Sequence, residues 1–407
     1  MCEGGSEVSG RIFDGLKVID CASFIAGPAA ATVMSDFGAE VIKIEPPGMG
    51  DPYRRRAIAN PERPLNPGFF FDSRNKKSLA LDLRQAKGRE VLHRLVRTAD
   101  VFITNYPPPA RERLGVTYAD LRHLNERLIY ASFTGYGEIG PEANKPGFDA
   151  TAWWARTGLM DLVRAGEATD PARSLPGMGD HPSALGTYGA IVTALYQREK
   201  TGKGAYVGSS LLANGLWANA CSLQAALCGD EVRPQPPRHE ALSALRVHYQ
   251  CRDGRWLLLS IAADEWRWEK FKTCFDHGGE LDDERFASDA LRNRHAHELV
   301  AILDRLFATR DLAHWRERLD EAGLIFGIVA KVEDIAGDEQ VLAAGFLRHF
   351  EDAPELLTID SPFFLAGQAK VAPRTAPAVG ENGDEILRDY GYGEVEIAAL
   401  RAAGVVA

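Results

Sequence analysis

Short apolar runs alternate with amphipathic stretches through the first third of the chain. Four runs rich in Val, Ile and Leu are predicted to form buried strands, at residues 16–20, 41–45, 101–104 and 128–133. Three stretches with apolar residues on one side are predicted to form helices, at residues 28–38, 87–98 and 118–126. Strands that alternate with helices in this way form βαβ units, so we predict a parallel sheet with helices on its faces.

The pattern changes after a long helix that is predicted for residues 182–200 and ends at Gly202. A proline-rich stretch at residues 229–238 then marks a linker. Beyond it, Asp253-Gly254 predicts a hairpin turn between two strand-like runs, at residues 247–251 and 256–260.

The remaining pattern predicts the domain organisation. Helices rich in Trp, Arg and Glu continue to about residue 323, followed by a strand at 325–332 and a helix at 394–403. We predict three segments: a large Rossmann-like α/β domain at residues 1–228, a small α+β domain at residues 229–325, and a return to the large domain at residues 326–407.

Charge and cysteine content narrow the classes of function. Among 407 residues, 57 Asp and Glu outnumber 47 Lys and Arg, a formal charge of −10. Nucleic-acid binding needs clustered positive charge, so we expect no nucleic acid as partner. The six cysteines form no C-x-x-C pair, and we expect no metal site. With no signal peptide and no bilayer-spanning run, we expect a soluble cytoplasmic protein without membrane contact.

A glycine motif follows the fourth predicted strand. Residues 135–140, Gly-Tyr-Gly-Glu-Ile-Gly, match the dinucleotide pattern G-x-G-x-x-G. That site also requires a helix N-terminus directed at the pyrophosphate, whereas Pro141 and a polar stretch follow here. A nicotinamide-dependent dehydrogenase therefore stays a minor alternative, which cofactor fluorescence would detect.

Asp180 is the main candidate for chemistry, in the sequence Gly177-Met178-Gly179-Asp180-His181-Pro182. An Asp before Pro and an apolar-periodic helix is typical of a helix N-cap, which is the purely structural interpretation. The functional interpretation places a carboxylate beside flexible glycines, where a bulky substrate approaches its oxygen and nearby backbone N–H groups steady an oxyanion. Both interpretations can hold together.

Two groups of basic residues are candidates for binding the phosphates of an anionic ligand. Arg and Lys form charge-assisted bonds to phosphate, although such runs are more often solvated surface. The candidates are Arg54, Arg55, Arg56, Arg74, Lys76, Lys77 and Arg84.

Several motifs occur in one order along nearly the whole chain: Asp14–Asp20, Ala26–Pro28, Gly38–Pro46, Asn75–Ser78, Arg113–Gly115, Gly179-Asp180 and Arg198–Gly204. Together they resemble class III CoA-transferases, a family of the CaiB/BaiF type that includes formyl-CoA transferase, carnitine CoA-transferases and α-methylacyl-CoA racemase. The segment Lys145–Asp149 looks closest to transferases that act on 2-hydroxy acids and aryl-lactates.

The resemblance implies a specific activity and site. The family's nucleophilic aspartate falls on Asp180, and at the free-aspartate pKa of about 3.9 this residue is expected to be ionised at neutral pH. The implied substrates are an acyl-CoA and a carboxylic acid, with no tightly bound cofactor, and the implied assembly is an interlocked homodimer. The family's contacts to coenzyme A fall on Phe24, Ile25, Ala26, Leu81, Arg84, Asn105, Tyr106, Arg113, Lys145 and Phe148.

Departures from the family pattern affect the choice of reaction. The racemase branch has a histidine where this chain has Phe148, and a racemase needs a base on each side of the α-carbon. Pro46 replaces an arginine that holds the nucleotide in some members, and residues 242–247 lack the glycine-rich lid loop of formyl-CoA transferase. The alternatives are an acyl-CoA racemase or isomerase of the same fold, and a catalytically silent CoA-binding protein.

Overall fold

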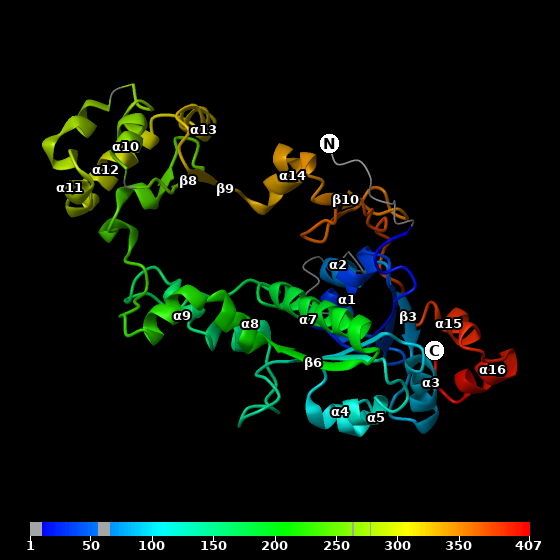
Figure 1. Cartoon of the computed structure of the whole chain (residues 1–407). Helices are drawn as coiled ribbons and strands as arrows, with labels where there is room; N and C mark the ends of the chain where they lie inside the picture. Colours follow the sequence, from blue (N-terminus) through cyan, green and yellow to red (C-terminus); the bar gives the residue numbers. More distant parts are fainter. Residues whose placement is uncertain (1–9, 56–65, 263, 277) are drawn as a thin grey trace. The chain divides into compact units, whose positions relative to one another are not determined.

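The structure is a computed structural model that describes residues 10–55, 66–262, 264–276 and 278–407 (Figure 1). The chain forms two compact units. The first is built from residues up to Met160, from Arg173–Gly229 and from Ala343–Ala407, and the second from Asp161–Ala172 and Asp230–Leu342. The sequence-based boundaries at residues 229 and 326 stay predictions for independently folding domains.

A six-stranded parallel sheet forms the centre of the first unit (Figure 1). Its order is β3-β2-β1-β4-β5-β6, and each neighbouring pair is parallel. This is the Rossmann strand order, and the predicted parallel α/β sheet is confirmed. The order reverses between β1 and β4, which leaves a crevice at the carboxyl edge. The strands are β1 (Lys17–Asp20), β2 (Glu40–Glu45), β3 (Lys77–Ala80), β4 (Val101–Thr104), β5 (Ile129–Thr134) and β6 (Ala205–Ser210).

Helices cover both faces of this sheet because alternate strand residues point to opposite sides. On one face, residues such as Val18 and Val41 pack with α1 (Ala26–Asp36) and α7 (Asp180–Thr201). On the other face, residues such as Ile19 and Ile42 pack with α3 (Ala86–Val96), α15 (Gly383–Asp389) and α16 (Glu394–Ala402). Burial on both faces explains why these strands are continuous apolar runs.

The C-terminal segment covers β3, the outermost strand on one side of the sheet. Leu81, which follows this strand, pairs with Val406 in an antiparallel bridge. The Ser78 N–H donates to Asn382 Oδ1 at 3.0 Å, across 304 positions of sequence. These contacts satisfy backbone groups that an edge strand otherwise leaves open.

The second unit combines a small antiparallel sheet with helices. Its sheet pairs β7 (His248–Gln250), β8 (Trp256–Leu259) and β9 (Phe326–Val329). The β7–β8 hairpin turns at the predicted position, where Gly254 has a φ of +77°. Aromatic residues such as Phe271, Phe307 and Trp315 fill its core. Its helices are α10 (Glu265–Lys272), α11 (Asp289–Arg294), α12 (Ala296–Phe307) and α13 (Leu312–Glu321).

Several elements differ from the sequence-based prediction. The helix predicted for residues 182–200 begins at Asp180, and the helix predicted for 118–126 is the single turn α5 (Tyr118–Leu121). The prediction missed β3 and β6. Other elements are α2 (Pro67–Ser73), α4 (Pro108–Leu114), the π-helical turn η2 (Asp149–Ala155), α6 (Leu159–Leu162), α8 (Leu211–Ala218), α9 (Ala220–Leu227), α14 (Glu339–Ala343), β10 (Leu347–His349) and β11 (Leu357–Ile359).

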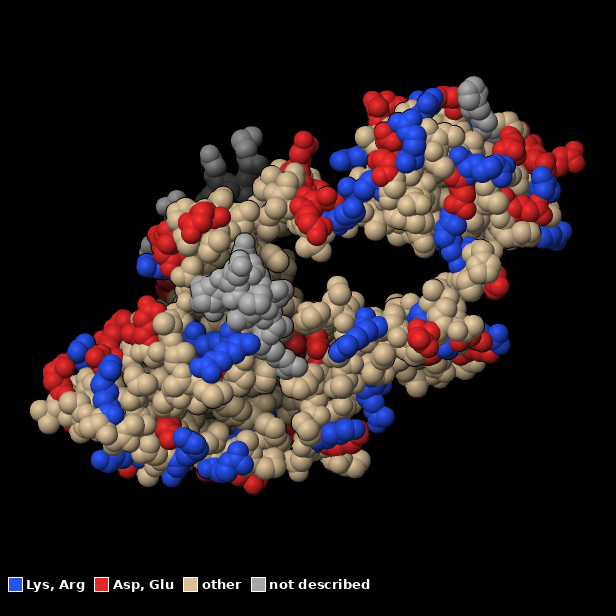
Figure 2. Space-filling view, turned by 180° about the vertical axis from the view of Figure 1, so that it is seen from behind, with Lys and Arg blue, Asp and Glu red and all other residues tan. Residues whose placement is uncertain are grey.

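On the face shown in Figure 2, Lys and Arg side chains lie interspersed with Asp and Glu side chains. Among the helices of the described ranges, none combines the length and apolar character needed to cross a membrane.

Candidate active site

A cavity of about 340 Å³ lies at the carboxyl edge of the parallel sheet in the first unit. Its walls come from the loop after β1, with Ser23–Ala26, and the loop after β4, with Asn105–Pro108. The loop after β5 and the side chain of Asp180 complete it. The two first loops leave the sheet where the strand order reverses, which is where open α/β sheets bind ligands.

Asp180 enters this cavity as the first residue of α7. The N-cap is Gly179 and forms no side-chain bond, so the predicted N-cap role of Asp180 is wrong by one position. A Cβ atom at position 179 would lie 2.6 Å from ring atoms of Trp153. Glycine therefore lets the start of α7 pack against the tryptophan of η2. The Asp180 carboxylate is left for the cavity instead of capping the helix.

The surroundings of Asp180 favour its neutral form. Its pKa is raised to about 7, first by burial and then by the nearby carboxylates of Asp149 and Asp72, against an opposing effect of His181. The expected full ionisation at neutral pH is therefore wrong, because the free-aspartate value assumes full hydration. Asp149 is itself fixed by accepting a hydrogen bond from the Ala150 N–H at 2.7 Å.

His181 and Asp72 form an acid–base pair next to Asp180. His181 Nε2 lies 3.1 Å from Oδ1 of Asp72, a buried residue of α2. Burial lowers the pKa of His181, but its hydrogen bond to Asp72 and the charges of Asp72 and Asp180 produce a net rise. Protonation of His181 is therefore favoured by the acidic groups around it, and the protonated ring supplies positive charge next to Asp180.

A buried ion network supports one wall of the cavity. Phe24 has a φ of +64°, a conformation that is strained for a non-glycine residue. Its N–H donates to Asp51 Oδ1 at 3.1 Å. Asp51 is held by Lys43 Nζ at 2.8 Å, while Lys76 Nζ lies 2.8 Å from Asp20 Oδ2. The network holds Phe24 in place, with its ring edge-on to Phe148 at 5.5 Å.

The structure brings most of the predicted coenzyme A contacts together. Seven of them line the cavity with Asp180: Phe24, Ile25, Ala26, Asn105, Tyr106, Lys145 and Phe148. Leu81, Arg84 and Arg113 do not line it. Leu81 is 2% exposed because it packs in the sheet core, and the Arg84 side chain is 79% exposed and paired with Asp82. Arg113 is exposed on α4.

Most of the candidate phosphate-binding residues form ion pairs with acidic residues of the protein. Arg54 pairs with Glu45, Arg74 with Asp36, and Lys77 with Glu40 and Glu385. Lys76 is buried against Asp20, as described above. Sequence did not reveal these pairings: Glu45 is 9 positions from Arg54, but the partners of Arg74 and Lys77 lie 37 or more positions away along the chain. Arg55 is exposed, and Arg56 lies outside the described residues.

Two backbone N–H groups at the start of α7 already have acceptors within the protein. The Gly179 N–H donates to Asp149 Oδ2 at 3.4 Å, the His181 N–H to the Gly177 carbonyl at 3.2 Å, and Pro182 has none. The N-cap residue of α1, Ile25, makes no side-chain capping bond either. Ile25 and Ala26 line the cavity, so the start of α1 also presents its N-terminus to a ligand there.

Other candidate chemistries find no support at this edge. The glycine motif at residues 135–140 is followed by turns, and the next helical element is η2. A dinucleotide site needs a helix there. Within the described ranges, no three His, Cys, Asp or Glu side chains are grouped as metal ligands.

Comparison with known proteins identifies the family. Residues 13–383 match the family described as CoA-transferase family III. The chain belongs to this family. It is 32% identical over 97% of its length to (R)-2-hydroxy-4-methylpentanoate CoA-transferase of Clostridioides difficile, covering 99% of that protein. It is also 32% identical over 96% of its length to cinnamoyl-CoA:phenyllactate CoA-transferase of Clostridium sporogenes, covering 96% of that protein.

Solved structures agree with this assignment. A CaiB/BaiF family protein from Brucella suis superposes with a TM-score of 0.84 at 26% identity, covering 94% of this chain and all of that one. The chain is therefore a family III CoA-transferase, an enzyme whose substrates are CoA thioesters.

Not every residue that lines the cavity was identified from the sequence. Thr134 and Leu211 line the cavity, and Asp149 lies close enough to change the pKa of Asp180. Thr134 was detectable in principle, because it directly follows the strand predicted for residues 128–133, at the edge where parallel sheets bind ligands. Asp149 belongs to the segment Lys145–Asp149 that resembles the family, but no sequence pattern brings it near position 180.

Proposed function

We propose that this enzyme transfers CoA from an acyl-CoA donor to a carboxylic acid, with Asp180 as the covalent nucleophile. The supporting observation is that Asp180 faces a cavity at the strand-order reversal, in surroundings that raise its pKa to about 7. A poorly solvated carboxylate is a stronger nucleophile than a hydrated one, and the reaction needs an oxygen that a thioester carbonyl can reach.

The first half of the reaction loads CoA onto the enzyme. An Asp180 oxygen attacks the thioester carbonyl, the C–S bond breaks, and an acyl-aspartyl anhydride and CoA thiolate form. The thiolate then attacks the aspartyl carbonyl, releasing the donor carboxylate and leaving an aspartyl-CoA thioester. An acceptor carboxylate reverses both steps and regenerates Asp180. Donor, acceptor and catalyst are all carboxylates, which keeps the intermediates close in energy.

The start of α1 is suited to stabilise the oxyanions of these steps. Each attack places negative charge on a carbonyl oxygen, which hydrogen-bond donors and positive electrostatic potential stabilise. The N-terminus of α1 carries partial positive charge and lacks a side-chain cap at Ile25. Because Ile25 and Ala26 line the same cavity as Asp180, we assign the oxyanion site to this turn.

The cavity wall suits an apolar acyl group. Phe24, Phe148, Phe133 and Leu211 line the cavity and give its wall an apolar part. Because the relatives are named for 2-hydroxy-4-methylpentanoate and phenyllactate, we propose branched or aromatic 2-hydroxy acids as acceptors. We further propose that the enzyme acts in the cytoplasm as an interlocked homodimer, as the family resemblance implies.

Intact mass spectrometry tests the nucleophile. Incubation with acyl-CoA and no acceptor should add a covalent acyl or CoA group to the enzyme, located on Asp180 by peptide mapping. Asp180→Ala should show no adduct. Asp289→Asn is a matched control, because Asp289 is also the first residue of a helix but does not line the cavity, and it should retain the adduct. Normal transfer by the alanine variant would end the proposal.

The raised pKa predicts a pH dependence. Only ionised Asp180 is nucleophilic, so kcat/KM should rise as the pH rises through about 7. Asp149→Asn removes a charge that raises this pKa, so the midpoint should move to lower pH. The measurement is kcat/KM for acyl-CoA between about pH 5 and pH 9 in both proteins. An unchanged midpoint in the variant would show that the rise in kcat/KM reflects the ionisation of another group.

The racemase alternative is tested with the same protein. Phe148 lines the cavity at the position where the racemase branch has a histidine, so one of the two required bases is missing. Incubation of acyl-CoA in heavy water without acceptor should therefore give no α-proton exchange at a rate near that of transfer. A silent CoA-binding protein would bind CoA yet form no adduct.

A further inference from the structure

One guanidinium connects two walls of the active-site cavity. Arg111 of α4 is 4% exposed. Its Nε donates to the carbonyl of Tyr106, in the loop after β4, at 2.6 Å. Its Nη1 donates to Glu138 Oε1, in the loop after β5, at 2.7 Å. Tyr106 lines the cavity, and so do residues 143 and 145–148 of the second loop.

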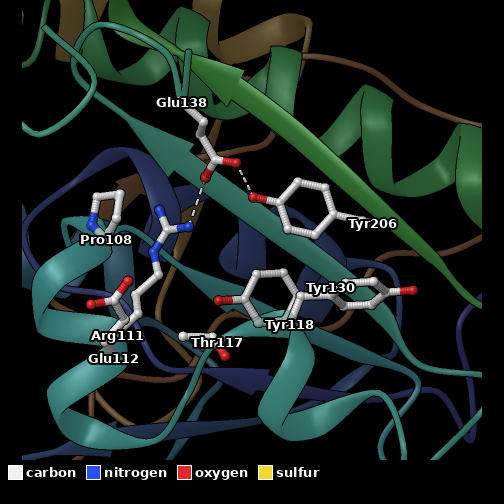
Figure 3. Close-up of a pocket in the computed structure, with 8 residues that line it drawn as sticks. All are labelled: Pro108, Arg111, Glu112, Thr117, Tyr118, Tyr130, Glu138 and Tyr206. Atoms are coloured by element: carbon white, nitrogen blue, oxygen red, sulfur yellow. Dashed lines mark hydrogen bonds and ion pairs between the residues drawn. The ribbon is translucent and has the colours of Figure 1, made fainter. Parts of the chain in front are cut away.

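Glu138 is anchored to the sheet as well as to Arg111. It also accepts hydrogen bonds from the hydroxyl groups of Ser132 in β5 and Tyr206 in β6. Figure 3 shows the carboxylate between Arg111 and Tyr206. Burial raises the pKa of Glu138, but the bonds from Ser132, Tyr206 and Arg111 give a net lowering, so the Glu138 carboxylate is ionised at neutral pH. We call the bonded pair Arg111–Glu138 the clamp.

The loop that carries Glu138 has a weaker anchor near its middle, the solvent-accessible ion pair between Glu142 and Arg156 at 3.3 Å. Its two ends meet where Gly135 and Gly147 pack backbone to backbone, since a Cβ at Gly135 would lie 3.2 Å from Gly147 Cα. Ile139, next to Glu138, is 94% exposed. A pocket of about 230 Å³ beside Arg111 leaves room for Glu138 to move if the guanidinium is lost (Figure 3).

We propose that Arg111 and Glu138 are positioning residues that hold the loop at residues 135–148 closed over the cavity and so keep water from the aspartyl intermediates. This inference rests on the proposed function of Asp180. In the step that the clamp prevents, water adds to the aspartyl-CoA carbonyl and the C–S bond breaks. The products are the Asp180 carboxylate, CoA thiol and one proton, and the net reaction is hydrolysis of acyl-CoA.

The partition between hydrolysis and transfer tests this role. We measure free CoA thiol against acceptor acyl-CoA for the wild type, Arg111→Gln, Glu138→Gln and Tyr206→Phe. The ratio of hydrolysis to transfer should rise about tenfold in the first two variants and less in Tyr206→Phe, which removes one bond from Glu138. Arg111→Lys keeps the charge but cannot form both bonds, so its ratio should be intermediate.

Labelled water identifies the site of attack. In H₂¹⁸O, hydrolysis at the aspartyl carbonyl places ¹⁸O in the Asp180 carboxylate, whereas transfer to an unlabelled acceptor does not. Arg127→Gln is the matched control, because Arg127 is exposed and its Nη1 donates to the Gly202 carbonyl away from the cavity lining. Its ratio should equal that of the wild type.

The possible results separate the two proposals. In one outcome, the wild type forms an Asp180 adduct and the clamp variants have the same ratio of hydrolysis to transfer as the wild type. The proposed role of Arg111 and Glu138 is then wrong, whereas the proposed role of Asp180 as nucleophile is retained. If the wild type forms no adduct, the proposed function fails first. Loss of hydrolysis and transfer in equal proportion would show that Arg111 serves stability alone, and would also overturn the clamp.

Discussion

Replacing Asp180 by Asn should lower the rate of CoA transfer by at least about 10,000-fold, a loss of about 5 kcal/mol of transition-state stabilisation. The amide has the shape of the carboxylate but no nucleophilic oxygen, so neither the anhydride nor the aspartyl thioester can form. Steady-state transfer between an acyl-CoA and a free acid measures the effect. A loss of less than about tenfold would exclude Asp180 as the covalent catalyst.

The same variant should be more stable than the wild type at alkaline pH. The pKa of Asp180 is raised to about 7 in the folded protein, so folding increasingly disfavours its ionised form as the pH rises from the free-aspartate value through 7. Asparagine does not ionise and avoids this cost. The Tm of Asp180→Asn should therefore exceed that of the wild type at about pH 8 and match it near pH 4. A lower Tm at both pH values would mean that the lost activity reflects damage to the fold.

Replacing Lys43 by Met should destabilise the protein by about 3–5 kcal/mol. Lys43 is fully buried, and its Nζ lies 2.8 Å from Asp51 Oδ2 and 3.7 Å from Asp20 Oδ2. Removing this charge leaves Asp51 without its partner and Asp20 with Lys76 alone. Methionine fills similar volume, so the loss reports charge rather than packing. Urea denaturation measures the change in the free energy of unfolding.

Two further variants decide whether the buried charge is responsible. Lys77→Met removes a half-exposed lysine that pairs with Glu40 and Glu385, and should cost no more than about 1 kcal/mol. The double variant Lys43→Met/Asp51→Asn removes both charges of the close pair and should recover part of the loss. If the double variant is less stable than the sum of its single changes predicts, unpaired charge is not the cause.

The strands that were predictable from sequence are those buried on both faces. β1, β2, β4 and β5 are nearly continuous apolar runs because helices cover both sides. β3 begins with Lys77 and Ser78, which bond to acidic residues of neighbouring segments, so it carries no apolar run. β6 contains Gly208 and alternates between half-buried and exposed residues. Both missed strands lie at the ends of the sheet.

Only those parts of the candidate site that have a local sequence signal were predictable. The start of α7 and the loops after β1 and β4 could be located, because strand ends and helix starts have local signals. The charges around Asp180 could not be predicted, since Asp72 and Asp149 reach it through tertiary packing. For the same reason the sequence suggested phosphate contacts at Arg54 and Arg74, whereas folding places both in ion pairs.

The contact between β3 and the C-terminal segment has a consequence for synthesis on the ribosome. Ser78 and its partner Asn382 lie 304 positions apart, which corresponds to about 15–60 seconds of translation at about 5–20 residues per second. Until then, the outer strand of the nascent sheet presents unpaired backbone groups to other chains. Protection of the newborn enzyme from aggregation therefore depends on its last helices, after the rest of the sheet has been made.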